Sequence, residues 1–286
     1  MAVDGSTDAG SRQSARVTDA KSLNGWIMTS VPPSASVPSI PLPTQRPGEW
    51  SVGGAIVFAL VVIGVAQLAG FILLQLWLGR SQTRLLDPQV MQGARGLAAA
   101  HAFVVVQLTV QVLQIALALM LAGWGGGHRS SALGLAPASL SLQRWLGLLG
   151  MFFAVKTLAS VVAAGLTGSS PRSELEPFRA LLVDPTTQYL FLVAVVLAGV
   201  SEELVFRGVL SRTFEATPLG FWAGAAVING LFAVVHLQYG VGGQLVVFVI
   251  GMMLSWIRMR TGSLWPCIVC HAANNAIAFL AMRALL

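Results

Sequence analysis

The chain has 286 residues, of which 55% are hydrophobic and only 10% are charged. Soluble domains carry roughly 25% charged residues, so this composition excludes an ordinary soluble domain and indicates an integral membrane protein. The net charge is +6, but the 17 basic residues are scattered among the loops with no basic stripe interleaved with aromatic residues. We therefore expect membrane lipids as surroundings and no nucleic-acid partner.

The first 49 residues differ in composition from the rest. They are rich in Ser, Thr, Asp and Gly and then in Pro, as in VPPSASVPSIPLPTQRPGEW at residues 31–50. No apolar stretch follows a charged start, so the segment does not have the pattern of a cleavable signal peptide. We expect residues 1–49 to be a disordered tail with an extended Pro-rich tether.

Seven apolar stretches follow the tail, each with few or no charged residues. A helix needs about 20 such residues to cross the hydrocarbon core of a bilayer. We predict spans at residues 51–79, 96–127, 145–170, 186–209, 221–237, 241–256 and 264–285. An eighth is expected only if one long stretch contains two segments or if residues 133–142 dip into the interface. The predicted fold is all-α, a polytopic transmembrane helical bundle of about seven to eight spans.

Charged residues occur inside the fourth stretch, in AGVSEELVFRGVL at residues 198–210. A charge at the centre of a spanning helix costs roughly 2.5–3.5 kcal/mol, so such residues usually face a protein interior and carry function. Glu203 and Arg207 are four residues apart with the Glu first, which favours an ion pair. Glu202 points about 100° away from Glu203 and is expected to stay free for chemistry. The alternative is a helix end with three interfacial charges.

Two later stretches contain further polar residues. His236, in NGLFAVVHLQYG, is the only ionisable group of its stretch and follows Phe232 by one helical turn. His271 and Asn275, in CIVCHAANN, are four residues apart and share one helix face. A packed, hydrogen-bonded histidine and helix–helix hydrogen bonding by the Asn are the structural alternatives.

The three patterns together resemble those of a known family. Glu-Glu-x-x-x-Arg, Phe-x-x-x-His and His-x-x-x-Asn stand here as SEELVFR, FAVVH and HAANN, in that order. In a C-terminal helical bundle this set is similar to that of the CAAX prenyl endopeptidase and bacteriocin-processing (CPBP, or Abi) intramembrane proteases. The resemblance covers about residues 186–285. We accordingly divide the chain into a tail (1–49), N-terminal transmembrane spans (50–170) and a catalytic CPBP-like core (171–286).

The resemblance implies an intramembrane endopeptidase that cleaves a peptide bond near the membrane surface. In the glutamate mechanism proposed for the family, Glu202 activates water and His236 shares or orients that water. His271 and Asn275 would donate hydrogen bonds to the oxyanion. The implied substrate is a peptide or a membrane protein, with or without an attached lipid.

The remaining charged residues of the motif would have a supporting role. Glu203 and Arg207 would hold the helix and set the electric field at the site. The family has also been described as metalloproteases, and Glu202, His236 and His271 would then be the zinc ligands, leaving a position open for water. The zinc mechanism would have no separate general base unless Glu203 gave up its ion pair with Arg207. We expect no cofactor and keep zinc as the alternative.

Cys267, Cys270 and His271 also spell C-x-x-C-H, the attachment pattern of c-type haem. A haem would take His271 from the motif that it completes with Asn275. We therefore expect the two cysteines to be buried free thiols that act as small apolar side chains.

The expected depths of two site residues in the membrane conflict. If residues 186–209 and 221–237 both cross the bilayer, Glu202 and His236 lie near opposite ends and over 10 Å apart at ~1.5 Å per residue. The conflict eases if the fourth span continues to about Arg212, and we predict that it does.

Two other functions and the orientation complete the expectations. The same bundle would serve a non-catalytic scaffold or immunity-type protein, or a transporter with a proton relay through Glu202 and His236. No internal repeat supports the transporter. A small excess of Arg and Lys on the tail's side predicts a cytoplasmic N-terminus, and we expect the protein in the plasma (inner) membrane.

Overall fold

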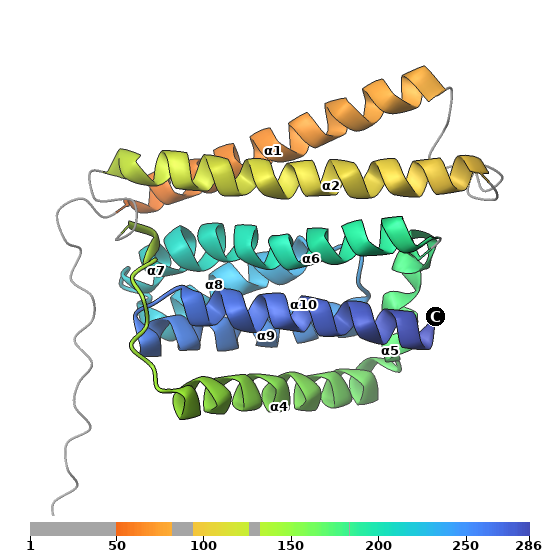
Figure 1. Ribbon diagram of the computed structural model, residues 1–286. Coiled ribbons are helices and arrows are strands. Elements are labelled where there is room, and N and C mark those ends of the chain that lie inside the picture. Colours follow the sequence, from red (N-terminus) through yellow and green to blue (C-terminus); the bar gives the residue numbers. More distant parts are fainter. Residues whose placement is uncertain (1–49, 82–93, 126–131, 183) are drawn as a thin grey trace, which may run out of the picture. The chain divides into compact units, whose positions relative to one another are not determined.

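A computed structural model describes residues 50–81, 94–125, 132–182 and 184–286 (Figure 1). These residues all belong to one compact unit, Leu42–Leu286. The predicted tail, residues 1–49, lies outside the described residues. In the part of the chain that is described, every regular element is a helix and there is no strand, so the predicted all-α fold is confirmed.

The helices follow the predicted apolar stretches closely. Their bounds are α1 Val52–Ser81, α2 Ala94–Leu121, η1 Ala122–Gly125, α4 Leu142–Thr167, α5 Pro171–Leu175, η2 Glu176–Leu181, α6 Pro185–Val205, η3 Phe206–Leu210, α7 Ser211–Glu215, α8 Gly220–Val234, α9 Val241–Thr261 and α10 Trp265–Leu285. Each of the seven stretches contains one of the longer helices.

Six helical runs in the described residues are long and apolar enough to cross a membrane. They are α1, α2, α4, the run from α6 to α7, α9 and α10. The seventh predicted stretch is α8, which has 15 residues and is shorter than a full span. Large apolar side chains such as Leu60 and Leu166 are exposed on these helices, as lipid-facing positions require. The polytopic bundle is thereby confirmed.

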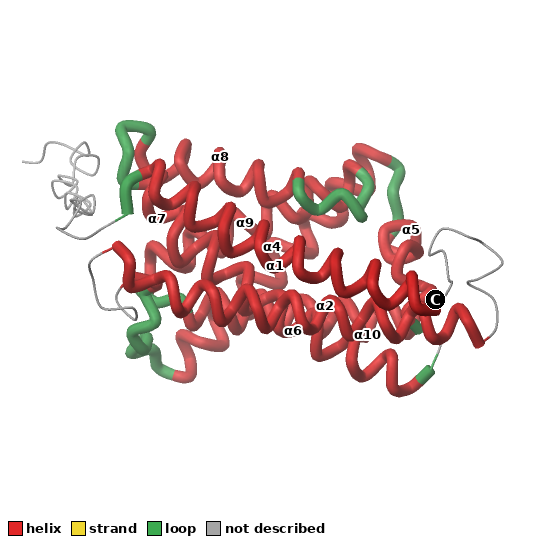
Figure 2. The backbone as a smooth tube through the Cα atoms, turned by 90° about the horizontal axis from the view of Figure 1, so that it is seen from above, coloured by secondary structure: helices red, strands yellow, loops and turns green. Residues whose placement is uncertain are grey.

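α6 is the central helix of the packing around the site. It packs against α2 on one side and against α10 on another, while α9 packs against α4 and α8 (Figures 1 and 2). α6 begins at Asp184, whose carboxylate accepts hydrogen bonds from the backbone N–H groups of Thr186 (2.9 Å) and Thr187 (3.2 Å). Pro185 at the first helical position lacks an N–H group there, so it fits this start.

The fourth span is longer than one α-helix. α6 continues through a π-helical turn, η3, into α7, so that the apolar run extends from Pro185 to Glu215. This confirms the prediction that the span continues to about Arg212. π-turns inside α-helices are frequent at functional sites, and this one contains Arg207.

The lengths of the run and of α8 remove the depth conflict. Glu202 lies 13 residues, or about 20 Å, before the end of the run at Glu215. After a short turn, α8 runs in the opposite direction for 15 residues, from Gly220 to Val234. His236 stands two residues after its end. The length of the run after Glu202 and the length of α8 are similar, so Glu202 and His236 lie at similar depths.

Candidate active site

The four predicted catalytic residues line one cavity. Its volume is ≈ 360 Å³, and its walls come from α2, α5, η2, α6, α8, α9, α10 and the turn after α8. Four of its wall residues are Glu202, His236, His271 and Asn275. The structure therefore brings together three polar motifs that are far apart in the sequence.

Glu203 and Arg207 form the expected ion pair beside this cavity. Arg207 Nη1 lies 2.9 Å from Glu203 Oε1, and both side chains are completely buried. A buried ion pair is stable only when further hydrogen bonds satisfy its remaining polar atoms. Removing one partner would leave an unpaired buried charge.

Arg207 has further partners that the sequence analysis did not identify. Its Nη2 donates to Asn229 Oδ1 at 2.8 Å, and Asn229 Nδ2 in turn donates to Ser255 Oγ at 2.9 Å. The guanidinium also lies 4.5 Å from the ring centre of Phe232, within cation–π range. The signal was present, since Asn229 is the lone amide of α8, in the same polar motif region as His236.

A glycine of α9 makes room for this network. A Cβ atom at Gly251 would lie 2.4 Å from Asn229 Oδ1 and 2.9 Å from Arg207 Nη2. The backbone of α9 therefore approaches the bond between these two side chains too closely for any side chain at this position.

His271 lies between the two glutamates. Its Nδ1 is 2.8 Å from Glu203 Oε1, and its Nε2 is 3.7 Å from Glu202 Oε2. Because Glu203 is paired with Arg207, its carboxylate is ionised and only accepts, so the His271 Nδ1–H group is the donor. The Nε2 atom is then the ring nitrogen that faces Glu202.

A close approach between α6 and α10 sets this geometry. A Cβ atom at Gly199 would lie 2.9 Å from the backbone nitrogen of Ala272. The helices thus come together next to His271, and the absence of a side chain at Gly199 permits it.

His236 lies just after α8 and is oriented by a carbonyl group of that helix. Its Nδ1 lies 2.6 Å from the carbonyl oxygen of Phe232, which only accepts, so Nδ1 carries a hydrogen. In the neutral ring, Nε2 is then an acceptor. The Phe232 ring lies edge-on to both histidines, with ring centres 4.6 Å from His236 and 6.0 Å from His271.

Asn275 uses only part of its hydrogen-bonding capacity. Its Nδ2 donates to the carbonyl oxygen of Val195 at 2.9 Å, which leaves the second amide N–H. Asn274 donates to Asn275 Oδ1 at 3.3 Å and also lines the cavity. Asn274 was not singled out in the sequence analysis, although it stands next to the motif residue.

Several polar atoms of the site have no hydrogen-bond partner among the described residues. They are Glu202 Oε2, Glu203 Oε2 and Arg207 Nε. An unsatisfied buried polar group costs roughly 1–3 kcal/mol, so such a concentration in one place indicates a functional site. The Glu202 side chain is 25% exposed, whereas that of Glu203 is fully buried.

The residues proposed as zinc ligands do not form a ligand set. In the described ranges, no three His, Cys, Asp or Glu side chains are close enough together to hold a metal ion. Glu202, His236 and His271 line the same cavity without converging on one point. Cys267 and Cys270 are free and buried, and the Cys267 thiol lies 3.3 Å from the carbonyl oxygen of Leu254.

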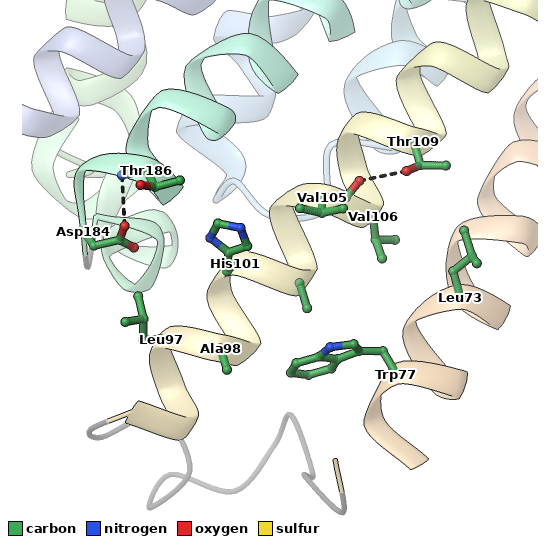
Figure 3. A pocket seen from close by; sticks show the side chains of 11 residues that line it. Leu73, Trp77, Leu97, Ala98, His101, Val105, Val106, Thr109, Asp184 and Thr186 are labelled. Carbon is green, nitrogen blue, oxygen red and sulfur yellow. Dashed lines mark hydrogen bonds between the residues drawn. The ribbon is translucent and has the colours of Figure 1, made fainter. Parts of the chain in front are cut away.

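A second, larger cavity of ≈ 810 Å³ lies between α1 and α2 (Figure 3). Its polar residues include His101, which projects from α2 toward Asp184 and Thr186. A hydrogen bond from the Thr187 hydroxyl holds the pKa of Asp184 below its usual range. Asp184 caps the N-terminus of α6, and no motif residue lines this cavity. The smaller cavity is therefore the candidate active site.

The comparisons with known proteins agree with this choice. Residues 185–277 match the family described as type II CAAX prenyl endopeptidase Rce1-like. The chain contains an Rce1-like domain. The match runs from the start of α6 into α10 and includes all six predicted site residues. Comparisons with curated proteins and with solved structures give no match.

The match confirms the predicted family on its CAAX-protease side. The Rce1-like domain is part of a multi-pass membrane protein and supports an intramembrane peptidase in general terms. α1, α2 and α4 lie outside the matched residues.

Proposed function

We propose that the protein is a metal-independent endopeptidase that uses Glu202 to activate water for cleavage of a peptide bond. The observation that carries the proposal is the shared cavity of Glu202, His236, His271 and Asn275 beside a fully buried Glu203–Arg207 pair. The Rce1-like match supports peptide cleavage as the reaction class.

The different surroundings of the two glutamates support Glu202 as the base. Glu203 is held by Arg207 and by the His271 Nδ1–H group, so its charge is already compensated. Glu202 has an oxygen without a hydrogen-bond partner and is partly exposed to the cavity. A carboxylate in reach of solvent and not paired with Arg207 is available to accept a proton from water.

The attacking water would be held by the groups around Glu202. Glu202 Oε2 is buried and lies 3.7 Å from His271 Nε2, so the water would contact the exposed part of the Glu202 carboxylate. His236 Nε2, an acceptor in the neutral ring, would orient the second hydrogen of this water. The water oxygen attacks the carbonyl carbon while its proton moves to Glu202.

The oxyanion would be stabilised from α10. The second N–H of Asn275 is one donor, and a protonated His271 supplies Nε2–H as another. With His271 protonated, the charges of Glu202, Glu203, Arg207 and His271 sum to zero, which suits an apolar environment. Glu202 then gives the proton to the leaving amine nitrogen as the C–N bond breaks.

A purified preparation in detergent tests the proposal directly. The probe is a farnesylated peptide ending in a CAAX tetrapeptide, with a fluorophore before the cysteine and a quencher on a side chain of the last three residues. The same peptide without the farnesyl group is tested in parallel. Cleavage by the wild type and none by Glu202→Gln would support the mechanism. Equal cleavage by both proteins would contradict it. No cleavage of either probe would favour the non-catalytic scaffold.

The proposal includes an orientation, with the N-terminus in the cytoplasm. Cys267 and Cys270 are buried, so a cysteine introduced at Ser14 would be the accessible thiol. A membrane-impermeant thiol reagent should leave it unlabelled in intact cells and label it after lysis. Labelling in intact cells would reverse the orientation.

A further inference from the structure

α2 lies outside the Rce1-like match, yet it contributes polar side chains to the candidate active site. Gln107 and Gln111 both line the cavity that contains Glu202. They are four residues apart and therefore share one face of the helix. Nothing in the motif set accounts for two amides in an apolar span, where each polar group needs a partner.

Contacts between α2 and α6 give the level of these amides. His101 of α2 contacts Thr187, and Gln111 contacts Ser201, at sequence separations of 86 and 90. The residue numbers of the two helices rise together from one contact to the next, so α2 and α6 run parallel. Gln111 therefore lies at the level of Glu202, and Gln107 lies one turn closer to the start of α6.

The hydrogen bonds of the two amides leave groups available. Gln111 Oε1 accepts from the Ser201 hydroxyl, which fixes the side chain and leaves both of its amide N–H donors. Gln107 takes part in no hydrogen bond with the residues that the structure describes. The cavity wall thus carries an oriented donor at Gln111 and a complete amide at Gln107.

The spacing of the amides matches an extended peptide. Residues four apart on an α-helix are separated by about 6 Å along its axis. An extended strand presents backbone groups of the same direction every two residues, or about 6.6–6.8 Å. Backbone groups of a substrate inside the bilayer must find partners, because no lipid group satisfies them.

We propose that Gln107 and Gln111 bind the backbone of the substrate and hold it extended across the cavity next to Glu202. Gln111 donates to a substrate carbonyl beside the scissile bond, and Gln107 pairs with the backbone about two residues away. This inference rests on the proposed function. It assigns substrate binding to a helix outside the matched domain.

The test combines enzyme variants with backbone-modified probes. In the farnesylated probe, one amide at a time is replaced by an ester, which removes an N–H donor and weakens the carbonyl as an acceptor. In the wild type, esters near the scissile bond should lower kcat/KM by roughly 3–10-fold each. In Gln107→Met or Gln111→Met, kcat/KM for the all-amide probe should fall by a similar factor. For each variant, one of the ester probes should then be cleaved with the same kcat/KM as the all-amide probe.

Gln114→Met is the matched control, because Gln114 is a buried amide of the same helix that does not line the cavity. It should show the wild-type dependence on every ester. Thermal unfolding of all variants in detergent identifies any general damage to the fold.

Additive losses at every ester position would overturn the inference while leaving the proposed function intact. An equal loss in Gln114→Met would do the same. A wild type that cleaves no probe would remove the proposed function and this inference together, so the two failures are distinguishable.

Discussion

Two adjacent glutamates have different surroundings, and this difference supports the roles proposed for them. Glu203 is fully buried between Arg207 and His271, whereas Glu202 is partly exposed in the cavity and has an oxygen without a partner. Helix geometry separates neighbours by 100°, so one can face the network and the other the substrate.

This difference predicts that one glutamine variant loses mainly activity and the other mainly stability. Glu202→Gln should lower the rate of cleavage by about 10²–10⁴-fold, the usual contribution of a general base, with little change in thermal stability. Glu203→Gln should lower the free energy of unfolding by about 3–5 kcal/mol, because Arg207 loses its buried counter-charge. Cleavage assays and thermal unfolding in detergent measure both. Identical behaviour of the two variants would contradict the assignment.

Tyr239 provides a test of the cavity's environment by titration. It lines the cavity after α8, and burial, aided by the charges of Glu202 and Glu174, raises its pKa to about 12. A phenol with a raised pKa stays protonated in the fold but ionises near 10 when unfolded. Stability is therefore lost as the pH rises from about 10 to about 12.

The chain has only two tyrosines, so Tyr189→Phe leaves Tyr239 as the single phenol. Phenolate absorbance of that variant should rise with a midpoint near pH 12 before unfolding. A midpoint near 10 would show that Tyr239 is in contact with solvent.

At the scale of the elements, close contacts between helices align the site. α6 approaches α10 at Gly199, and α9 approaches the Arg207–Asn229 bond at Gly251. Small residues at such points let helix backbones come together, as is common in membrane bundles. The alignment of His271 with the two glutamates therefore depends on a residue that has no side chain.

A methyl group at this contact should disturb the site. Gly199→Ala is expected to push α10 away and to lower cleavage by about 10-fold or more, because a misplacement of 1 Å can cost 10²-fold in rate. The control is Gly165→Ala in α4, where a Cβ atom meets nothing within 4 Å. It should retain wild-type cleavage. A Gly199→Ala protein with full activity would show that the contact does not position His271.

At the scale of the whole molecule, the site is larger than the matched domain. Residues 185–277 supply the motif residues, but the cavity is also lined by α2 and by α5 and η2. The helical segment Pro171–Leu181 packs Phe178 against Phe191 and Tyr239. The match therefore covers the motif residues, and the other helices line the rest of the cavity.

Most of the spans and the motif residues could be predicted from the sequence because their signals are local. A long apolar run and residues at i and i+4 require no knowledge of neighbouring helices. The contacts of Arg207 with Asn229 and of Ser201 with Gln111 join residues 22 and 90 positions apart. No local pattern shows which helices are neighbours, so these partners could not be predicted.

The end of α8 could not be predicted for a related reason. An apolar stretch at residues 221–237 is compatible with a span, but α8 ends after 15 residues and returns only to the depth of Glu202. The length of an apolar run does not reveal where packing ends a helix.

The most direct test of metal-independent glutamate catalysis is cleavage of the farnesylated probe after exhaustive treatment with a chelator. We predict full activity without bound metal and a rate lowered by about 10²–10⁴-fold in Glu202→Gln. The metal content of the treated protein is measured alongside to show that removal was complete. Activity that disappears with the metal and returns when zinc is added would contradict the account and make Glu202, His236 and His271 the metal ligands.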